Sequence, residues 1–176
     1  MVKNKLYSQL LCVFIYTLAF YISFILLPKS VTSIWLKITI WHLYATLFIY
    51  IGSVILKNSS LYDPFWSVAP IPIVVYLAFF YQNSVSLKVL ILLPILFWAL
   101  RLTRNWLISW RGFEHEDFRY IDLKNTNKIK AEFNNLFGIH LFPTLIVNLG
   151  LYPLLYVLTN NIAVNNFLIF ASFFTF

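Results

Sequence analysis

Long apolar runs separated by short polar segments make up most of this chain, and each run is continuous rather than alternating. At about 1.5 Å per helical residue, crossing the ~30 Å hydrocarbon core of a membrane takes roughly 20 apolar residues. Strands of a membrane barrel alternate apolar and polar side chains, so the continuous runs favour helices. The pattern predicts five spanning helices, at residues 6–28, 38–56, 65–81, 88–110 and 136–158.

The first, third and last runs each carry a further expectation. The first run is long for a signal peptide and lacks a clear small-x-small cleavage site, so we expect a retained helix. Pro70 and Pro72 are expected to bend the third span. The last run, 167–176, reaches only about half of the hydrocarbon core. The sequence therefore predicts an all-α polytopic integral membrane bundle, a single domain over residues 1–176, with five full transmembrane helices and a truncated sixth.

The amino-acid composition is typical of an integral membrane protein. Hydrophobic residues make up 61% of the chain and charged residues 11%, whereas a soluble domain has about 25% charged residues. The net charge of +7 is not interpreted as nucleic-acid binding, because the placement of the charges relative to the membrane matters more than their sum. The single cysteine, Cys12, cannot form an intramolecular disulfide.

Basic residues are distributed unevenly between the two sides of the predicted bundle. The N-terminal tail, the loop at 57–64 and the segment at 111–135 share one side and hold eight Lys and Arg residues, against three on the other side. The positive-inside rule then predicts a cytosolic N-terminus and a cytosolic segment 111–135. The glycosylation sequon Asn58-Ser59-Ser60 would face the cytosol and stay unmodified.

Most of the charge lies between residues 101 and 132, which hold seven of the 13 basic residues and five of the six acids. The spacing of Arg101, Arg104 and Arg111 predicts that they share one helical face. An arginine deep in a membrane costs on the order of 2.5–3.5 kcal/mol, so we expect the side chains to face the bundle interior or a wet cavity. With Trp106 and Trp110 beside them, they would form a groove for an anionic cofactor or headgroup. The alternative is that the span ends near residue 100 and the arginines reach lipid phosphates.

Asp63, in Y-D-P-F-W-S, is the only acid outside that segment. Asp before Pro at a helix start is a favourable N-cap with Pro at the first helical position. A carboxyl group beside aromatic rings at a membrane boundary also tends to keep its proton, which it can then donate to a carbonyl oxygen. The two roles do not exclude each other.

The histidines and the run Glu114-His115-Glu116-Asp117 do not predict a metal site. Consecutive residues point in different directions on a helix, and no spaced Cys or His completes a ligand set. His42 and His140 are lone histidines in apolar spans, where buried packing or a pore-facing position is expected.

Two motifs resemble a known family. R-L-T-R-N-W-L-I-S-W-R-G-F-E-H-E-D-F-R-Y at 101–120 resembles the signature of an uncharacterised membrane family, the domain of unknown function 1295 type, which is grouped with steroid 5-alpha-reductases. Y-D-P-F-W-S at 62–67 resembles its Asp-x-x-Trp element, and Phe118 stands where that family usually has Trp. The family's later Arg-His-Pro-Asn-Tyr-type motif does not occur here. The resemblance therefore covers the N-terminal two-thirds of a family member, and the chain is expected to be a fragment, a truncated product or a degenerate copy that is inactive alone.

The resemblance implies NADPH-dependent reduction of a carbon–carbon double bond conjugated to a carbonyl in a steroid or other lipid. Related reductases have an acid seven residues before a Pro, which makes Asp63, seven residues before Pro70, the candidate catalytic acid. Arginines suit the 2′-phosphate and pyrophosphate of the cofactor because a guanidinium fork matches phosphate oxygens. Glu116 and Asp117 with Arg119 form either a structural ion network or contacts to ribose hydroxyls. The residues implied to line or brace the cytosolic mouth of the cofactor site are Arg101, Arg104, Asn105, Arg111, Glu116, Asp117, Arg119 and Tyr120.

Two other functions stay open at this point. A membrane methyltransferase of the isoprenylcysteine type has a related architecture, although S-adenosylmethionine gives less reason for an arginine-rich mouth. A non-enzymatic scaffold or lipid-binding protein would use the charged segment only as a solvated face. The expected partners are the lipid bilayer and a hydrophobic lipid or steroid-like substrate, and the sequence does not say whether a second chain completes the bundle.

Overall fold

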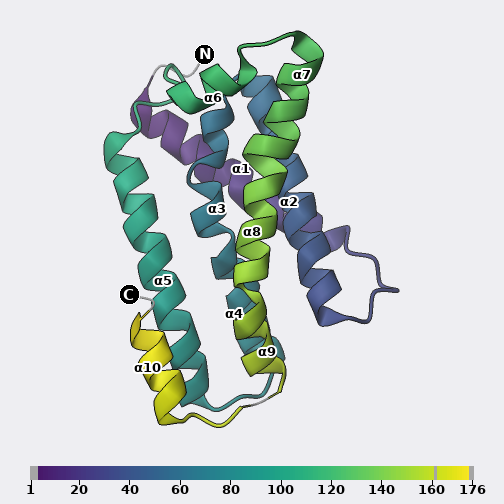
Figure 1. Ribbon diagram of the computed structural model, residues 1–176, viewed down its shortest axis with the longest axis vertical. Coiled ribbons are helices and arrows are strands. Elements are labelled where there is room, and N and C mark those ends of the chain that lie inside the picture. Colours follow the sequence, from purple (N-terminus) through teal and green to yellow (C-terminus); the bar gives the residue numbers. More distant parts are fainter. Residues whose placement is uncertain (1–3, 161, 175–176) are drawn as a thin grey trace.

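The computed structural model describes residues 4–160 and 162–174, and every regular element in these residues is helical (Figure 1). Five helical stretches are long and apolar enough to cross a membrane: 5–25, 34–56, 59–80, 85–109 and 128–159. The predicted all-α membrane bundle with five full spans is confirmed. Its elements are α1 (Lys5–Ile25), α2 (Ile34–Leu56), η1 (Ser59–Tyr62), α3 (Phe65–Val68), α4 (Pro70–Phe80), α5 (Val85–Ser109), α6 (Phe118–Lys124), α7 (Lys128–Phe133), η2 (Asn134–Leu141), α8 (Phe142–Gly150), α9 (Tyr152–Thr159) and α10 (Asn166–Phe174).

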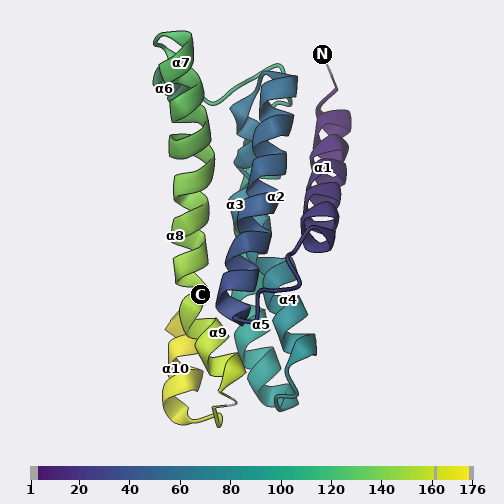
Figure 2. The ribbon, with the colours of Figure 1, turned by 90° about the vertical axis from the view of Figure 1, so that its right-hand side faces the viewer.

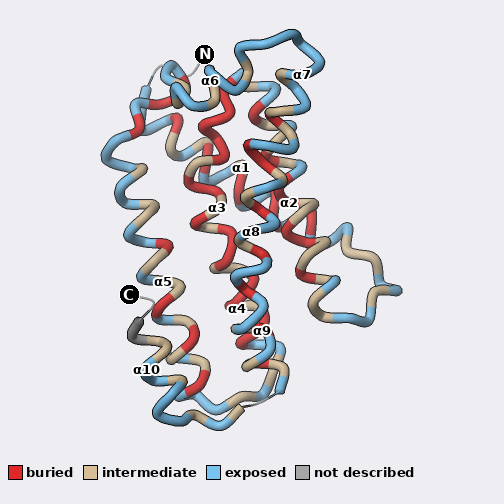
Figure 3. Tube along the Cα trace, viewed as in Figure 1, coloured by how far each residue is buried: buried red, intermediate tan, exposed pale blue. Residues whose placement is uncertain are grey.

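Most helices run roughly along the long axis of the molecule, whereas α1 crosses obliquely, and α3 lies between α5 and α8 in the view of Figure 1 (Figures 1 and 2). The burial pattern follows this order, because α3 and α4 are buried along much of their length while α5 and α8 each expose one face (Figure 3). In lipid, exposed apolar side chains such as Phe97 and Leu149 cost nothing, so close packing rather than the hydrophobic effect holds the helices together.

Aromatic packing around Phe65, which is fully buried, joins α1, α2 and the third span. Its ring lies 5.5 Å from that of Tyr16, 5.6 Å from that of Phe20 and 5.6 Å from that of Tyr62, measured between centroids. Pairs of this kind contribute about 0.5–1.5 kcal/mol each beyond the area they bury. They fix the start of α3 against α1, which positions the neighbouring Asp63.

The third span differs from the expected single bent helix. A 3-10 turn, η1, precedes it, and the helix is interrupted at Ala69, where α3 ends and α4 begins with Pro70. Pro70 has no N–H to donate to the preceding turn, which explains the interruption and confirms the predicted effect of the prolines. Asp63 has helical dihedral angles, φ −53° and ψ −48°, and α3 has no side-chain cap. The predicted N-cap role of Asp63 is therefore wrong.

The start of α1, the loop at 57–64 and the charged segment lie at one end of the bundle, as the predicted alternation of spans requires. Lys5 Nζ donates to the carbonyl of Ile108 at 3.0 Å, which joins the start of α1 to the end of α5. Asn58, 2% exposed, donates through its amide to the carbonyls of Phe113 and His115 at 3.0 and 3.3 Å. Asn58 is thus closed to glycosylation in the folded protein, whichever side of the membrane it faces.

The turn after α5 depends on Gly112. Among the described residues it is the glycine with a positive φ, +95°, and an added Cβ would lie 3.1 Å from Ser8 Oγ on α1. The helix itself ends at Ser109, and Trp110 is already extended. Arg111 therefore cannot share a helical face with Arg101 and Arg104, and that prediction is wrong.

The last described helix, α10, has nine residues and packs against α5. Pro94 lies inside α5 and cannot donate an N–H to the carbonyl of Leu90 four residues earlier. Ser172 Oγ of α10 donates to that carbonyl instead, at 2.9 Å. This hydrogen bond to the Leu90 carbonyl thus joins α10 to α5.

Candidate functional site

A hydrogen bond between Tyr120 and Asp63 joins the two sequence motifs at the polar end of the bundle. Tyr120, on α6, donates its hydroxyl to Asp63 Oδ1, although the two residues are 57 positions apart in the sequence. In the adjacent η1 turn, Ser60 Oγ accepts the N–H of Asp117 at 2.9 Å. Two hydrogen bonds therefore join the η1 turn and the residue that follows it to the start of α6.

Glu116 and Lys124 form an adjacent ion pair that fastens the same two segments. Lys124 Nζ lies 2.6 Å from Glu116 Oε1, and both side chains are mostly buried, at 23% and 16% exposed for Lys124 and Glu116 respectively. The same Glu116 oxygen accepts the N–H of Ser59 at 2.6 Å, while Lys124 Nζ donates to Ser59 Oγ at 3.1 Å. This network joins η1 to the segment around α6 through one oxygen of Glu116.

Asp117 and Arg119 complete the start of α6. Asp117 caps the helix by accepting the N–H of Arg119 at 2.9 Å, and Arg119 donates from Nε and Nη2 to its two oxygens at 2.8 Å each. These hydrogen bonds lower the pKa of Asp117 and raise that of Arg119. Burial, followed by the nearby Asp63 carboxylate, raises the pKa of Tyr120, so its hydroxyl stays protonated near neutral pH.

The arginines of α5 do not face the bundle interior, and that prediction is wrong. Arg101, Arg104 and Asn105 are exposed on the outer side of α5, and Arg111 is exposed in the turn that follows. Within the described residues, none of the three arginines has an ion-pair partner. The inner face of the helix is occupied by smaller groups instead, including Ala99 and Thr103.

The outward position agrees with the alternative in which the arginines reach phosphate groups. With 25 residues, α5 is about 37 Å long, several ångströms more than the hydrocarbon core. Arg101 lies eight residues, or about 12 Å, before Ser109, and its long side chain can extend towards the membrane surface. Trp106 and Trp110 stack with ring centroids 4.7 Å apart, but Trp110 is buried in the core and Trp106 packs against it. The predicted aromatic pair is thus confirmed, although the rings lie in the packed interior and not beside the exposed arginines.

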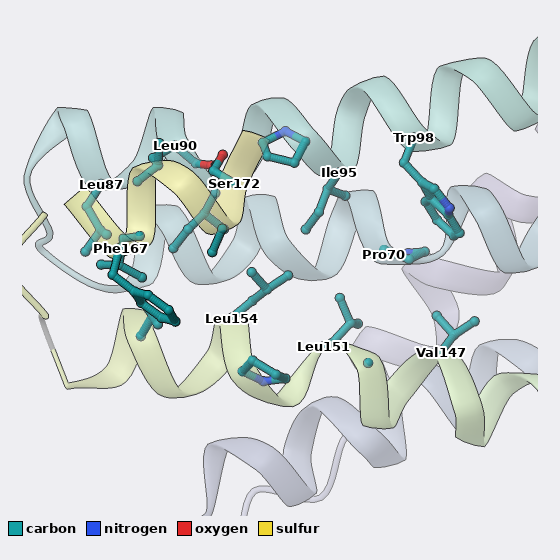
Figure 4. A pocket seen from close by; sticks show the side chains of 17 residues that line it. Pro70, Leu87, Leu90, Ile95, Trp98, Val147, Leu151, Leu154, Phe167 and Ser172 are labelled. Atoms are coloured by element: carbon teal, nitrogen blue, oxygen red, sulfur yellow. The ribbon is translucent and has the colours of Figure 1, made fainter. Parts of the chain in front are cut away.

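An apolar cavity of about 580 Å³ lies between α4, α5, α8, α9 and α10, further along the bundle from the polar cluster (Figure 4). Pro70, Trp98 and Val147 lie at one end, and Leu87 and Phe167 lie at the other (Figure 4). A volume of this size is typical of sites for small lipophilic ligands. Asp63 is not part of the cavity wall.

The third span and α5 pack closely between the cavity and Asp63. Pro70, in the cavity wall, follows Asp63 by seven residues, roughly 10 Å along a helix. Between them, Ser67 Oγ and Thr103 Oγ1 are 3.3 Å apart, and the rings of Trp66 and Trp98 are 5.6 Å apart. Among the described residues, the one hydroxyl in the cavity wall, that of Ser172, lies near the other end and donates to the Leu90 carbonyl.

Sequence reasoning did not find the buried polar groups between α2, η1 and α8. Tyr62 and Thr46 each lie within hydrogen-bond distance of Thr144 Oγ1, at 2.7 and 2.8 Å. His140, fully buried as expected, has Nδ1 2.8 Å from the Asn135 carbonyl within the π-helical η2. No local spacing signals these contacts, because each joins positions that only the fold brings together.

The predicted cofactor residues differ in whether they already have partners within this chain. Three guanidinium groups without carboxylate partners among the described residues, Arg101, Arg104 and Arg111, are suited to phosphate oxygens. By contrast, Glu116, Asp117, Arg119 and Tyr120 already bind groups of this chain. The eight predicted cofactor residues therefore divide into an exposed set on and after α5 and an internally bonded set around α6.

The fold and the polar end together define a multi-pass helical membrane protein. Residues 47–174 match the family model described as "Protein of unknown function (DUF1295)". Because this match covers more than half of the chain, the protein belongs to that family. No curated protein and no solved structure matches the chain.

Proposed function

We propose that this DUF1295 protein is a membrane oxidoreductase that reduces a carbon–carbon double bond conjugated to a carbonyl in a lipid, with NADPH as the reductant. The observation that carries the proposal is the hydrogen bond from Tyr120 to Asp63, at the polar end of a bundle that also holds an apolar cavity. The two sequence motifs that resemble the steroid 5-alpha-reductase group contribute one residue each to this pair.

Asp63 and Tyr120 have complementary roles in this reaction. When bound, NADPH supplies the hydride that is added to the β-carbon of the conjugated double bond. Asp63 in its protonated form donates a hydrogen bond through Oδ2 to the carbonyl oxygen and so stabilises the negative charge that develops there. Tyr120 keeps its hydrogen bond to Oδ1 and stabilises the carboxylate that remains once the proton has moved to the substrate oxygen.

The cofactor would be held by the exposed arginines. Arg101, Arg104 and Arg111, with Asn105, offer donors to the phosphate groups, while the ion pair of Glu116 and Lys124 keeps the start of α6 in place. We infer from the distribution of basic residues that this end of the bundle, including residues 111–135, faces the cytosol, where NADPH is available. In the resemblance, further cofactor contacts come from an Arg-His-Pro-Asn-Tyr-type motif, so residues 1–176 alone are expected to bind the cofactor weakly.

The first experiment is an NADPH titration of the chain in lipid nanodiscs, followed by fluorescence of the reduced nicotinamide. Arg104→Ala and Arg111→Ala are each expected to weaken binding about 5- to 10-fold, since each removes a charge-assisted hydrogen bond to phosphate. Lys128→Ala, which removes an exposed charge from α7, serves as the matched control and should leave binding unchanged. Binding of S-adenosylmethionine in place of NADPH would point to a methyltransferase, and binding of neither would favour a non-enzymatic lipid-binding protein.

The second experiment tests the acid. In membranes that contain the protein, Asp63→Asn should abolish NADPH-dependent reduction of an enone lipid and leave NADPH binding intact. An amide keeps the size and the acceptor of the side chain but cannot transfer a proton. Unchanged turnover in this variant would remove Asp63 from the mechanism.

A further inference from the structure

Asp63 ends a segment, 58–63, in which every residue is hydrogen-bonded to another part of the bundle. Residues 58–62 are no more than 2% exposed. The first three of them bond to residues of the charged segment. Tyr16 of α1 donates its hydroxyl to the Leu61 carbonyl, so α1 also holds this backbone in place.

Tyr62, which directly precedes Asp63, begins a chain of buried hydroxyl groups that runs to α2. Its oxygen lies 2.7 Å from Thr144 Oγ1 on α8, which in turn lies 2.8 Å from Thr46 Oγ1 on α2. Thr46 donates its single hydroxyl proton to the carbonyl of His42 at 2.9 Å, so it can only accept from Thr144. Thr144 then has no proton left for Tyr62 and accepts the tyrosine hydroxyl. The chain therefore has one direction, from Tyr62 through Thr144 to α2.

Thr144 is the member of this chain on which the place of Asp63 depends most. It is fully buried, and its oxygen is the acceptor that the Tyr62 hydroxyl uses. Valine has nearly the same shape as threonine but would leave the Tyr62 hydroxyl buried without that acceptor, and an unpaired buried hydroxyl is costly. Tyr62 would shift to find another partner. Asp63, the next residue in the chain, would shift with it.

We propose that Thr144 is a positioning residue, which through Tyr62 holds the Asp63 carboxyl where it meets both the Tyr120 hydroxyl and the substrate carbonyl. The inference rests on the proposed function for the reaction, but not for the position of the carboxyl. The bond from Tyr120 holds Asp63 relative to α6, and the bond from Tyr62 to Thr144 holds the same turn relative to α8. A misplacement of about 1 Å can cost about a hundredfold in rate. Thr144→Val should therefore lower kcat about 10- to 100-fold with little change in KM.

Thr39 supplies a matched control in the same helix interface. Its Oγ1 accepts from the Asn148 amide at 2.8 Å, a bond that also joins α2 to α8. Within the described residues, neither partner of this bond contacts the segment 58–63 through a hydrogen bond. Thr39→Val thus removes a comparable interhelical bond and leaves Tyr62 undisturbed. Thr144→Ser keeps the hydroxyl, loses only a methyl group and should restore the parent values.

The first test measures the coupling between Tyr120 and Asp63 in the full chain and does not depend on turnover. Unfolding equilibrium constants in bicelles are determined for the parent, Tyr120→Phe, Asp63→Ala and the double variant, and the departure from additivity gives a coupling factor. Thr144→Val in the background should lower this factor at least about threefold, whereas Thr144→Ser and Thr39→Val should leave it unchanged. An unchanged factor in Thr144→Val, or an equal loss in Thr39→Val, would overturn the proposal.

Thr46→Val is a milder variant for the case in which Thr144→Val does not fold. It takes away the acceptor of the Thr144 proton and leaves the acceptor of Tyr62 in place. The coupling factor should fall in this variant as well, by less than in Thr144→Val. A factor equal to that of the parent would count against the chain of hydroxyl groups as the device that places Asp63.

The second test separates this proposal from the reductase proposal. Turnover of an enone lipid with NADPH is followed in membranes that contain the protein. A loss of kcat in Thr144→Val that Thr144→Ser reverses supports both proposals. If the coupling factor falls as expected and the parent shows no turnover, the place of Thr144 in the fold stands and the reductase function fails. If the parent reduces the lipid and Thr144→Val has the same kcat, the reductase stands and the positioning role of Thr144 fails.

Discussion

The hydrogen bond between Tyr120 and Asp63 should contribute measurably to the stability of the fold, independently of any catalytic role. Tyr120→Phe removes the hydroxyl and leaves the ring in place, so Asp63 loses this hydrogen bond while the packing of the ring is kept. A hydrogen bond to a charged group is worth about 1.5–3 kcal/mol, and both residues here are only partly exposed. We therefore expect a coupling energy of about 1.5–3 kcal/mol between the two side chains.

A double-mutant cycle measures this coupling. The free energy of unfolding is determined in bicelles for the parent, Tyr120→Phe, Asp63→Ala and the double variant. Tyr156→Phe, an exposed tyrosine on α9, is the control and should change stability by less than about 0.5 kcal/mol. If the two substitutions are additive within about 0.5 kcal/mol, the hydrogen bond does not join the two motifs and the proposed catalytic pair loses its structural basis.

Three further predictions concern the interactions that hold the turn at Gly112 and the helix α6 in place. Gly112→Ala should destabilise the protein by about 1–2 kcal/mol because of its positive φ, whereas Gly138→Ala should be neutral or slightly stabilising; thermal unfolding of both variants checks this. Lys124→Met leaves a mostly buried carboxylate unpaired and should cost about 1–3 kcal/mol of unfolding free energy, and a cost near zero would mean that the ion pair is solvated. The pKa of Asp117 is lowered in the folded protein, so its hydrogen bond to Arg119 stabilises α6 fully at pH values above the ordinary carboxyl pKa of about 4. This stabilisation is lost as the pH falls through the lower pKa of the folded protein. The hydrogen-exchange rate of α6, corrected for intrinsic rates, should therefore rise only in strong acid.

The number of spans and the position of the charge follow from local properties of the chain. A run such as 88–110 is too apolar and too long for any other element, and the structure has α5 at nearly these bounds. The alternation of five spans places the start of α1 and the segment 111–135 at one end, as the hydrogen bond from the Phe113 N–H to Ser8 Oγ confirms. The signature around Gly112 could be recognised as a motif, although its reason, a positive φ against Ser8, could not.

The rotation of each helix about its own axis could not be predicted from the sequence. The wrong prediction for Arg101 and Arg104 shows why. A helix of a soluble protein reveals its inner face because its outer face is polar. In a bilayer both faces are apolar, so the periodic signal disappears and only packing against the neighbouring helices sets the rotation. The prediction that the arginines face inward rests on the free-energy cost of placing an arginine in lipid. An arginine can also avoid that cost by extending its side chain to the membrane surface.

The pairing of side chains from distant segments likewise depended on the tertiary structure. Asp63 is 57 residues from Tyr120, and nothing local distinguishes a carboxylate that caps a helix from one that accepts a tyrosine hydroxyl. Aromatic packing around Phe65 and the ion pair of Glu116 with Lys124 bring the two segments together. Hydropathy and charge thus decided that the chain is a helical membrane bundle with one polar end, while interhelical packing decided which residues meet there, because such contacts depend on the relative rotation and height of helices that the local sequence does not encode.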